Sequence, residues 1–234
     1  MNKPPPLILH RDENLLVVSK PSGMLVHKGW AKDGETLIDA LRQLGYSRLH
    51  TVHRLDRATS GIICLALNPD AARNLSEQFA ERQVTKRYLA LVRGVVKDSV
   101  FVDHPIPKEP GKERVPAQTQ IDVLASAKTL PRETSLVCAQ PLSGRTHQIR
   151  RHLKHLSHPI IGDVNYGRGE LNRAARERYG LHRLALHALS LTLRDPRSGQ
   201  MMTFSAQLPE DLSLPLIAMG YDSAIVEAAM KRCP

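Results

Sequence analysis

Residues 53–61, HRLDRATSG, set a single carboxylate, Asp56, between two arginines and then lead into an apolar run. That run, 61–67 (GIICLAL), is continuous and β-branched early on, which is typical of a buried strand entered through a tight turn. Loops held by rigid strands present side chains to clefts, and nearby arginines favour the ionised form of a carboxyl group. We therefore expect Asp56 to be an ionised acceptor and a potential nucleophile.

An isolated loop aspartate is more often a turn cap or one half of a surface ion pair. The composition indicates what such a loop could act on. The chain has 234 residues and a formal net charge of +10, with a sequence pI near 9.8, which suits a polyanionic partner. Nucleic acid is the leading candidate, and an anionic membrane surface is the rival. No apolar stretch approaches the ~20 residues of a spanning helix, and no signal-peptide pattern opens the chain. We therefore expect a cytoplasmic, monomeric protein with no obligate protein partner.

Hydrophobic periodicity divides the chain into short strands and a few helices. Strands are predicted around residues 7–9, 14–20, 61–67, 86–94, 99–103, 117–124, 134–139, 183–193 and 201–206. The three strands between 98 and 140 have the pattern of an antiparallel meander. Helices are predicted over 36–44, with Thr36 as N-cap, over 68–82, opened by Asn68 and Pro69, and over 146–156. We expect one domain, 1–234, with a frayed start at 1–6 and a helical tail at 209–234.

Four histidines within twelve residues, His147, His152, His155 and His158, raise the alternative of a metal-dependent hydrolase. Their spacing argues against it. No HExxH pattern is present, the histidines fall on different faces of the predicted helix, and acidic co-ligands are missing nearby. The three cysteines are widely separated and show no paired spacing. The sequence therefore predicts no metal site.

The run HRLDRATSG resembles the HRLDxxTSG signature of the RluA-type pseudouridine synthase family. Four further blocks fit the same family: KPSG at 20–23, KRYLALVRG at 86–94, the long block at 141–163 that contains GRTHQIR, and RLALHA at 183–188. The resemblance covers nearly the whole chain. It implies an α+β catalytic fold, with a mixed, mostly antiparallel central sheet flanked by helices, and no extra N-terminal RNA-binding module.

The resemblance also implies roles for individual residues. Asp56 matches the essential aspartate, Arg150 the arginine expected to pair with it, and Tyr88 the tyrosine that packs on the target base, although a strand tyrosine is by default a core residue. Leu186 matches a residue that lines the base pocket. Arg54 is expected to fill the space left by a flipped base, or else to contact a phosphate. Further contacts with RNA are expected from His53, Thr59, Lys20, Arg145, His147, Arg151 and Lys154.

Converting uridine to pseudouridine breaks the N1–C1′ bond and joins C5 to C1′ without redox change or net hydrolysis, so no cofactor is expected. Two peripheral segments, 25–30 (LVHKGW) and 172–173 followed by 179–188, resemble the tRNA pseudouridine synthase C subgroup, which acts at tRNA position sixty-five near the acceptor/T-stem junction. The alternatives are a ribosomal or dual RNA target and, more distantly, a noncatalytic RNA-binding protein. An aromatic content of 4% argues against stacking-platform modules.

Overall fold

The computed structural model describes residues 5–28, 34–108, 112–129 and 131–232. The chain forms two compact units: the first comprises Met1–Lys86 and Ala188–Gln207, and the second comprises Arg87–His187 and Leu208–Pro234. It passes from one to the other within two strands, β5 (Thr85–Arg93) and β11 (Leu186–Arg194), and again after Gln207. The prediction of one catalytic domain over 1–234 stays a prediction. The predicted frayed start at 1–6 lies largely outside the described residues, as do the last two residues of the segment 25–30.

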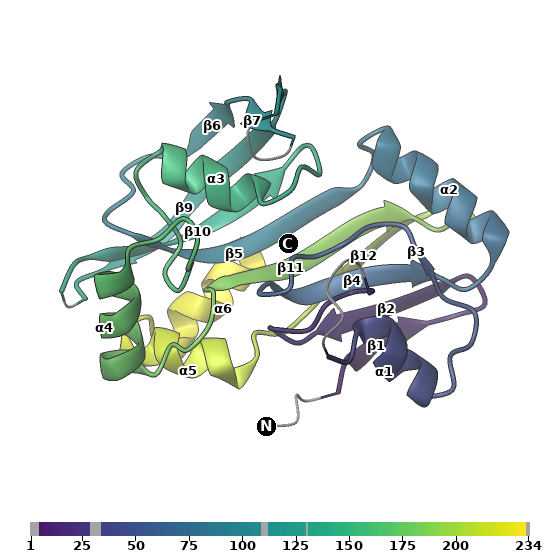
Figure 1. Ribbon diagram of the computed structural model, residues 1–234, viewed down its shortest axis with the longest axis horizontal. Helices are drawn as coiled ribbons and strands as arrows, with labels where there is room; N and C mark the ends of the chain where they lie inside the picture. The colour runs from purple at the N-terminus through teal and green to yellow at the C-terminus, as the bar shows by residue number, and fades with distance from the viewer. Residues whose placement is uncertain (1–4, 29–33, 109–111, 130, 233–234) are drawn as a thin grey trace. The chain divides into compact units, whose positions relative to one another are not determined.

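The first unit is built on a sheet whose strands follow the order β1-β2-β4-β11. In Figure 1, β1 (Leu7–Arg11) and β2 (Leu15–Lys20) form an antiparallel hairpin, and β2 pairs antiparallel with β4 (Ser60–Ala66). The two-residue strand β3 (His50–Thr51) pairs with the end of β4, and β12 (Met201–Ser205) pairs with β11. Every residue of β4 is buried, as its apolar run predicts.

Two helices of the first unit begin at the residues that the sequence predicts. Helix α1 (Leu37–Gln43) opens with a capping box, in which Thr36 accepts from the Asp39 amide and the Asp39 carboxylate accepts from the Thr36 amide. Helix α2 (Pro69–Ala80) has Asn68 as N-cap and Pro69 at its first position, and it packs against β4. Capping residues therefore fix both helix starts.

The second unit contains the predicted meander. Strands β5, β10 (Thr134–Pro141), β9 (Gln118–Ala127) and β6 (Val100–Asp103) pair antiparallel in this order. A separate short hairpin joins β7 (Ile106–Pro107) to β8 (Arg114–Val115). The predicted strands at 99–103, 117–124 and 134–139 are thus confirmed.

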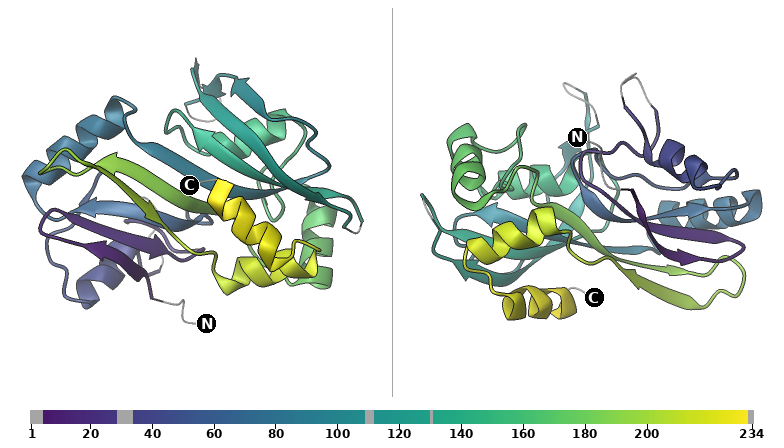
Figure 2. Two further views of the ribbon diagram at one scale, coloured as in Figure 1. Left: turned by 180° about the vertical axis from the view of Figure 1, so that it is seen from behind. Right: turned by 90° about the horizontal axis from the view of Figure 1, so that it is seen from below.

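Four helices accompany these strands. Helices α3 (Gln148–His155) and α4 (Gly169–Tyr179) lie on one side of them, and α5 (Glu210–Ala218) and α6 (Ser223–Arg232) on the other (Figure 2). Helix α3 packs against β10, and α6 against β9. The helical tail and the helix at 146–156 were predicted, whereas α4 was not. Only one residue of α4, Ala175, is fully buried, so its sequence carries little hydrophobic periodicity.

The turn that opens β4 depends on Gly61. Its φ is +107°, and a Cβ atom built there would lie 2.2 Å from the carbonyl oxygen of Ala188 in β11. That oxygen belongs to rigid backbone and cannot move aside as a flexible side chain could. Glycine at 61 thus lets β4 approach β11 directly beside the Asp56 loop.

We predict that Gly61→Ala destabilises the protein by at least about 2 kcal/mol, because it combines an unfavourable backbone conformation with a backbone clash. Urea unfolding followed by circular dichroism measures the change. The matched control is Gly199→Ala, whose φ of +72° is also positive but whose surroundings are open within 4 Å. Equal destabilisation of the two variants would contradict the role given to the Ala188 carbonyl.

Candidate active site

In the first unit, Asp56 lies half-buried in the loop between β3 and β4. Its carbonyl oxygen accepts from the Thr59 amide at 3.0 Å, which closes a tight turn. The neighbouring turn at 20–24 holds this loop in place: Gly23 donates to the Arg57 carbonyl at 2.7 Å, and Ser22 Oγ donates to the Ala58 carbonyl at 2.8 Å. The backbone on the C-terminal side of Asp56 is therefore fixed by hydrogen bonds.

Lys20 provides a further link between the two turns. Its ammonium donates to the carbonyl oxygens of Pro21 and Met24 at 2.9 and 2.8 Å, and more weakly to that of Arg57 at 3.4 Å. Lys20 and Thr59, which the sequence assigned to RNA contact, are only 1% and 2% exposed. The RNA contact expected of both residues stays a prediction. Each supports the loop.

His53 anchors the start of the Asp56 loop to β4. Its Nε2 accepts from the Cys64 amide at 3.0 Å, and its ring stacks on Phe79 of α2 with centroids 4.5 Å apart. Accepting this bond requires the neutral imidazole. Burial, with a smaller contribution from Lys86, lowers the pKa of His53 to about 3, and burial lowers the pKa of Lys86 to about 8. The predicted contact of His53 with RNA stays a prediction; the contacts described here support the loop.

The pKa of His53 implies a pH-dependent stability. Because the unfolded imidazole titrates near 6.5 and the folded one near 3, protons bind the unfolded state more readily between these values. The stability that comes from keeping His53 neutral in the folded state is present above about pH 6.5. As the pH falls below that value, the free energy of unfolding decreases by about 1.4 kcal/mol per pH unit.

We predict that His53→Gln, which keeps an acceptor but does not titrate, unfolds with a shallower pH dependence than the wild type between about pH 6.5 and about pH 5. Urea unfolding across this range measures it, with the exposed His182→Gln as control. Parallel pH profiles for the wild type and His53→Gln would show that His53 carries no such linkage.

In the second unit, the loop that leads into α3 is organised by Gln148. This side chain is buried, and its amide group makes four hydrogen bonds: Oε1 accepts from Ser143 Oγ and the Arg145 amide, and Nε2 donates to the Gln118 carbonyl and Thr119 Oγ1. His147, at the helix N-cap, has a left-handed backbone with φ of 55° and provides no side-chain cap. The hydrogen bonds of Gln148 therefore hold this turn in place.

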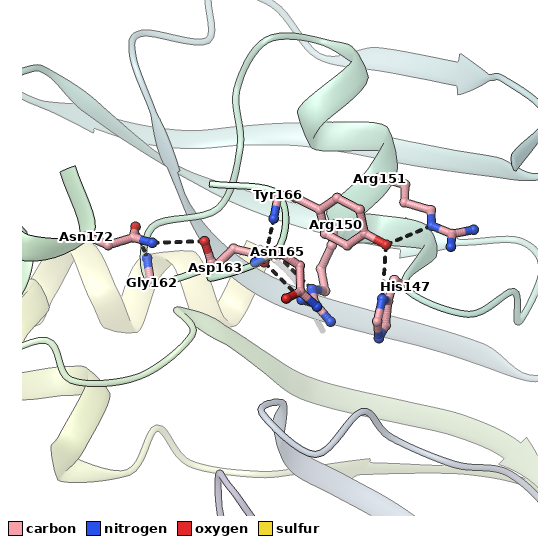
Figure 3. Close-up of polar contacts among 8 residues, drawn as sticks. All are labelled: His147, Arg150, Arg151, Gly162, Asp163, Asn165, Tyr166 and Asn172. Atoms are coloured by element: carbon pink, nitrogen blue, oxygen red, sulfur yellow. Dashed lines mark hydrogen bonds and ion pairs between the residues drawn. The ribbon is translucent and has the colours of Figure 1, made fainter. Parts of the chain in front are cut away.

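Arg150 forms a buried, two-pronged ion pair with Asp163 (Figure 3). Nε donates to Oδ2 at 2.7 Å and an Nη to Oδ1 at 2.9 Å, with side-chain exposures of 6% and 0%. Asp163 Oδ1 also accepts from the amides of Asn165 and Tyr166. Burial opposes ionisation of Asp163, but the hydrogen bonds and charge of Arg150 and these amides outweigh it and lower the pKa. Both charges thus persist at neutral pH.

The aromatic ring of Tyr166 lies among the cationic side chains of α3. It lies 5.0 Å from the Arg150 guanidinium and 5.7 Å from the Lys154 ammonium. Its hydroxyl accepts from Arg151 Nε at 2.9 Å and forms a 3.1 Å hydrogen bond with His147 Nδ1 (Figure 3). The basic face predicted for this helix therefore gathers around a single tyrosine.

The remaining residues that the sequence assigned to the site range from buried to exposed. Tyr88 is half-buried in β5, as expected, and Leu186 is a buried residue at the start of β11. Arg54 and Arg145 are exposed. Asp56 belongs to the first unit and Arg150 to the second, and the pairing between them stays a prediction.

The histidines that suggested a metal site have other partners. His152 Nε2 donates to the His104 carbonyl and Nδ1 bonds Thr119 Oγ1, while His158 Nδ1 donates to the Arg93 carbonyl. His155 stacks on His104. Within the described ranges, no group of three or more His, Cys, Asp or Glu residues could hold a metal ion.

No helix in that same part of the chain is long and apolar enough to cross a membrane.

Sequence reasoning missed Asp163, Tyr166 and Gln148. The first two lie in the segment GDVNYG, and Gln148 lies inside the GRTHQIR motif, so their position in or beside a motif was the available signal. Their roles depend on contacts between residues that are not neighbours in the chain, such as the 13-residue separation of Arg150 and Asp163.

We predict that Asp163→Ala lowers the free energy of unfolding by about 3–5 kcal/mol, because it leaves a buried guanidinium without its carboxylate. Urea denaturation at neutral pH measures this. The double variant Arg150→Met/Asp163→Leu removes both charges and should recover most of the stability. An Asp163→Ala protein as stable as the wild type, or a double variant no better than the single one, would refute the account.

Comparison with known proteins gives consistent matches along the chain. The family model described as RNA pseudouridylate synthase matches residues 14–155. The tRNA pseudouridine synthase C of Haemophilus ducreyi is 38% identical over 232 residues, covering 92% of this chain and 96% of the relative. That of Vibrio cholerae is 34% identical over 238 residues, covering 94% and 98%.

Two solved human structures are also similar. RNA pseudouridylate synthase domain containing 4 has a TM-score of 0.74 at 29% identity and covers 92% of this chain and 93% of its own. RNA pseudouridylate synthase domain containing 1 has a TM-score of 0.76 at 28% identity, with coverage of 98% and 96%. These matches confirm the predicted α+β fold class, with a mixed sheet flanked by helices.

Proposed function

The chain belongs to the RNA pseudouridylate synthase family, and we propose that its substrate is tRNA and its target the uridine at position sixty-five. As a family member it is an isomerase that converts uridine to pseudouridine. The observation that carries the tRNA assignment is the near full-length similarity to relatives named tRNA pseudouridine synthase C, such as those of Haemophilus ducreyi and Vibrio cholerae. A tRNA substrate would place the enzyme in the cytoplasm.

In this proposal Asp56 is the catalytic carboxylate. The reaction must break the bond between uracil N1 and ribose C1′ and form one between C5 and C1′, so a nucleophile has to engage either the base or the sugar. Asp56 is half-buried in a loop whose backbone is held by the turn at 20–24. A carboxylate on a fixed loop can be placed against the reacting atoms at little entropic cost.

Arg150 is proposed to stabilise the charge of Asp56 when the site is assembled. Its guanidinium is already oriented by Asp163, so little side-chain freedom is lost on forming a further contact. Tyr88 and Leu186 would confine the freed uracil and keep water from it. Tyr88 is half-buried, which suits a residue with one face on the core and one toward a base.

The target uridine must leave its stack before Asp56 can reach it, at a cost of a few kcal/mol. Arg54 is proposed to occupy the vacated space. It lies two residues before Asp56 and is exposed, and its planar guanidinium can stack between neighbouring bases or bind a phosphate.

Mapping pseudouridines in total RNA from cells that lack this gene tests the substrate. We predict loss of pseudouridine at tRNA position sixty-five and unchanged ribosomal RNA. Loss in ribosomal RNA alone would refute the tRNA assignment, and loss in both would indicate dual specificity.

Complementation of the same cells tests the role of Asp56. Wild-type protein should restore the modification, and Asp56→Asn, made at the same level, should not, because the amide cannot act as the nucleophile. Purified Asp56→Asn should still bind tRNA, since the carboxylate acts in the chemical step. A substantially active Asp56→Asn enzyme would remove Asp56 from the mechanism.

A further inference from the structure

The second unit contains an open cavity of about 740 Å³ that the proposed chemistry does not use. Its walls come from the end of β5, the turn before β10, the loop after α3 and the first turn of α4. The charged and titratable groups that line it are Arg93, Arg132, His158, Arg168 and Glu170. Three guanidinium groups and one carboxylate therefore share the cavity wall, which makes it a site for an anion.

The arginines differ in how firmly they are held. Arg93 donates from an Nη to the Ser157 carbonyl at 2.7 Å, so its guanidinium is fixed at the wall. Arg132 and Arg168 are exposed, and within the described residues neither side chain forms an ion pair, nor does Glu170. Arg132 and Arg168 are thus available to a ligand, and the guanidinium of Arg93 beside them is already oriented.

The start of α4 adds hydrogen-bond donors to the same wall. Arg168 is the N-cap residue and makes no side-chain cap, while Arg168 and Leu171 both line the cavity. The first intrahelical bond runs from the Asn172 amide to the Arg168 carbonyl, so the amides of residues 169–171 have no partner in the helix. Free amides at a helix N-terminus favour a phosphate group, and the guanidiniums provide bidentate partners for it.

The cavity lining points to the backbone of a nucleic acid. No Phe, Tyr or Trp side chain lines the cavity in the described part of the chain, and its one aromatic ring is the imidazole of His158, whose Nδ1 donates to the Arg93 carbonyl. The lining therefore offers cations more than stacking surfaces. The cavity is open and far larger than one phosphate needs. Cations from separate segments suit a polymer whose phosphates pass across them.

The cavity also lies next to the segment that positions Arg150. Asn172, in the first turn of α4, donates from Nδ2 to the Asp163 carbonyl and accepts from the Gly162 amide (Figure 3). We propose that the cavity binds a backbone phosphate of the substrate RNA outside the reacting nucleotide, and so docks the RNA onto the second unit. This inference rests on an RNA substrate, as the proposed function does.

The double variant Arg132→Ala/Arg168→Ala tests the proposal. With full-length protein and tRNA, we predict a roughly tenfold rise in KM and in Kd near 0.1 M salt with kcat retained, because these arginines position RNA without touching the reacting atoms. The slope of log K against log salt should become shallower by about 1, as expected when one fewer phosphate is neutralised. Arg132→Lys/Arg168→Lys keeps the charges and should recover most of the slope.

Arg197→Ala is the matched control, because this arginine of the first unit is 75% exposed in its side chain and lies outside the cavity. It should leave the salt slope unchanged. An unchanged slope and KM in the double alanine variant, with folding confirmed by its thermal melt, would overturn the proposal.

The cavity could bind free inorganic phosphate in place of an RNA phosphate, and titration with inorganic phosphate distinguishes the two. If the double alanine variant no longer binds inorganic phosphate but keeps the wild-type salt slope for RNA, the cavity is a free-phosphate site and RNA docking is refuted. The binding slopes remain measurable even if tRNA proves not to be modified, so failure of this inference and failure of the proposed function are separable.

Discussion

The ion pair between Arg150 and Asp163 is the interaction on which the candidate site of the second unit depends. Burying two charges costs several kcal/mol per ion, and the cost is offset only where geometry is good and the remaining acceptors are satisfied. Asp163 meets that requirement with two bonds from Arg150 and two from backbone amides. Its own carbonyl accepts from Asn172 and Gly167, so the segment from α3 to α4 is tied to one residue. Removing the Asp163 carboxylate would therefore affect Arg150 and the amides of Asn165 and Tyr166 together, whereas its main-chain carbonyl would still accept from Asn172.

The first unit fixes its part of the site by different means. The ammonium of Lys20 is held by carbonyl oxygens, and His53 is held through a backbone amide and a stacked ring. Neither contact places another carboxylate beside Asp56. The loop is thus positioned by hydrogen bonds to backbone groups and by a stacked ring, and Asp56 is the acidic residue of the segment 52–59. Positioning the loop during folding means that less conformational freedom remains to be lost when RNA binds.

The parts of the fold that local signals specify could be predicted from sequence. The capping box at Thr36, the Asn68–Pro69 helix start and the buried run of β4 each depend on neighbouring residues. Helix α4 was missed because it buries one residue and starts at an arginine that provides no cap. Among site residues, the motif indicated Arg150 but not its partner Asp163, and it gave no indication that Lys20 faces inward. Residue type reveals charge, whereas burial follows from tertiary contacts that a single sequence does not display.

Lys20 separates two properties that are usually attributed to the same residues. A deeply buried lysine counts toward the formal net charge of the protein, yet a cation that contacts no phosphate displaces no counterion from a nucleic acid. Arg150 and Arg183, each bound to a carboxylate, are similarly committed. All 33 lysines and arginines count toward the formal net charge of +10, but only those at the surface are accessible to a nucleic acid. The net charge of the chain and its attraction for a polyanion are therefore set by overlapping but different groups of cations.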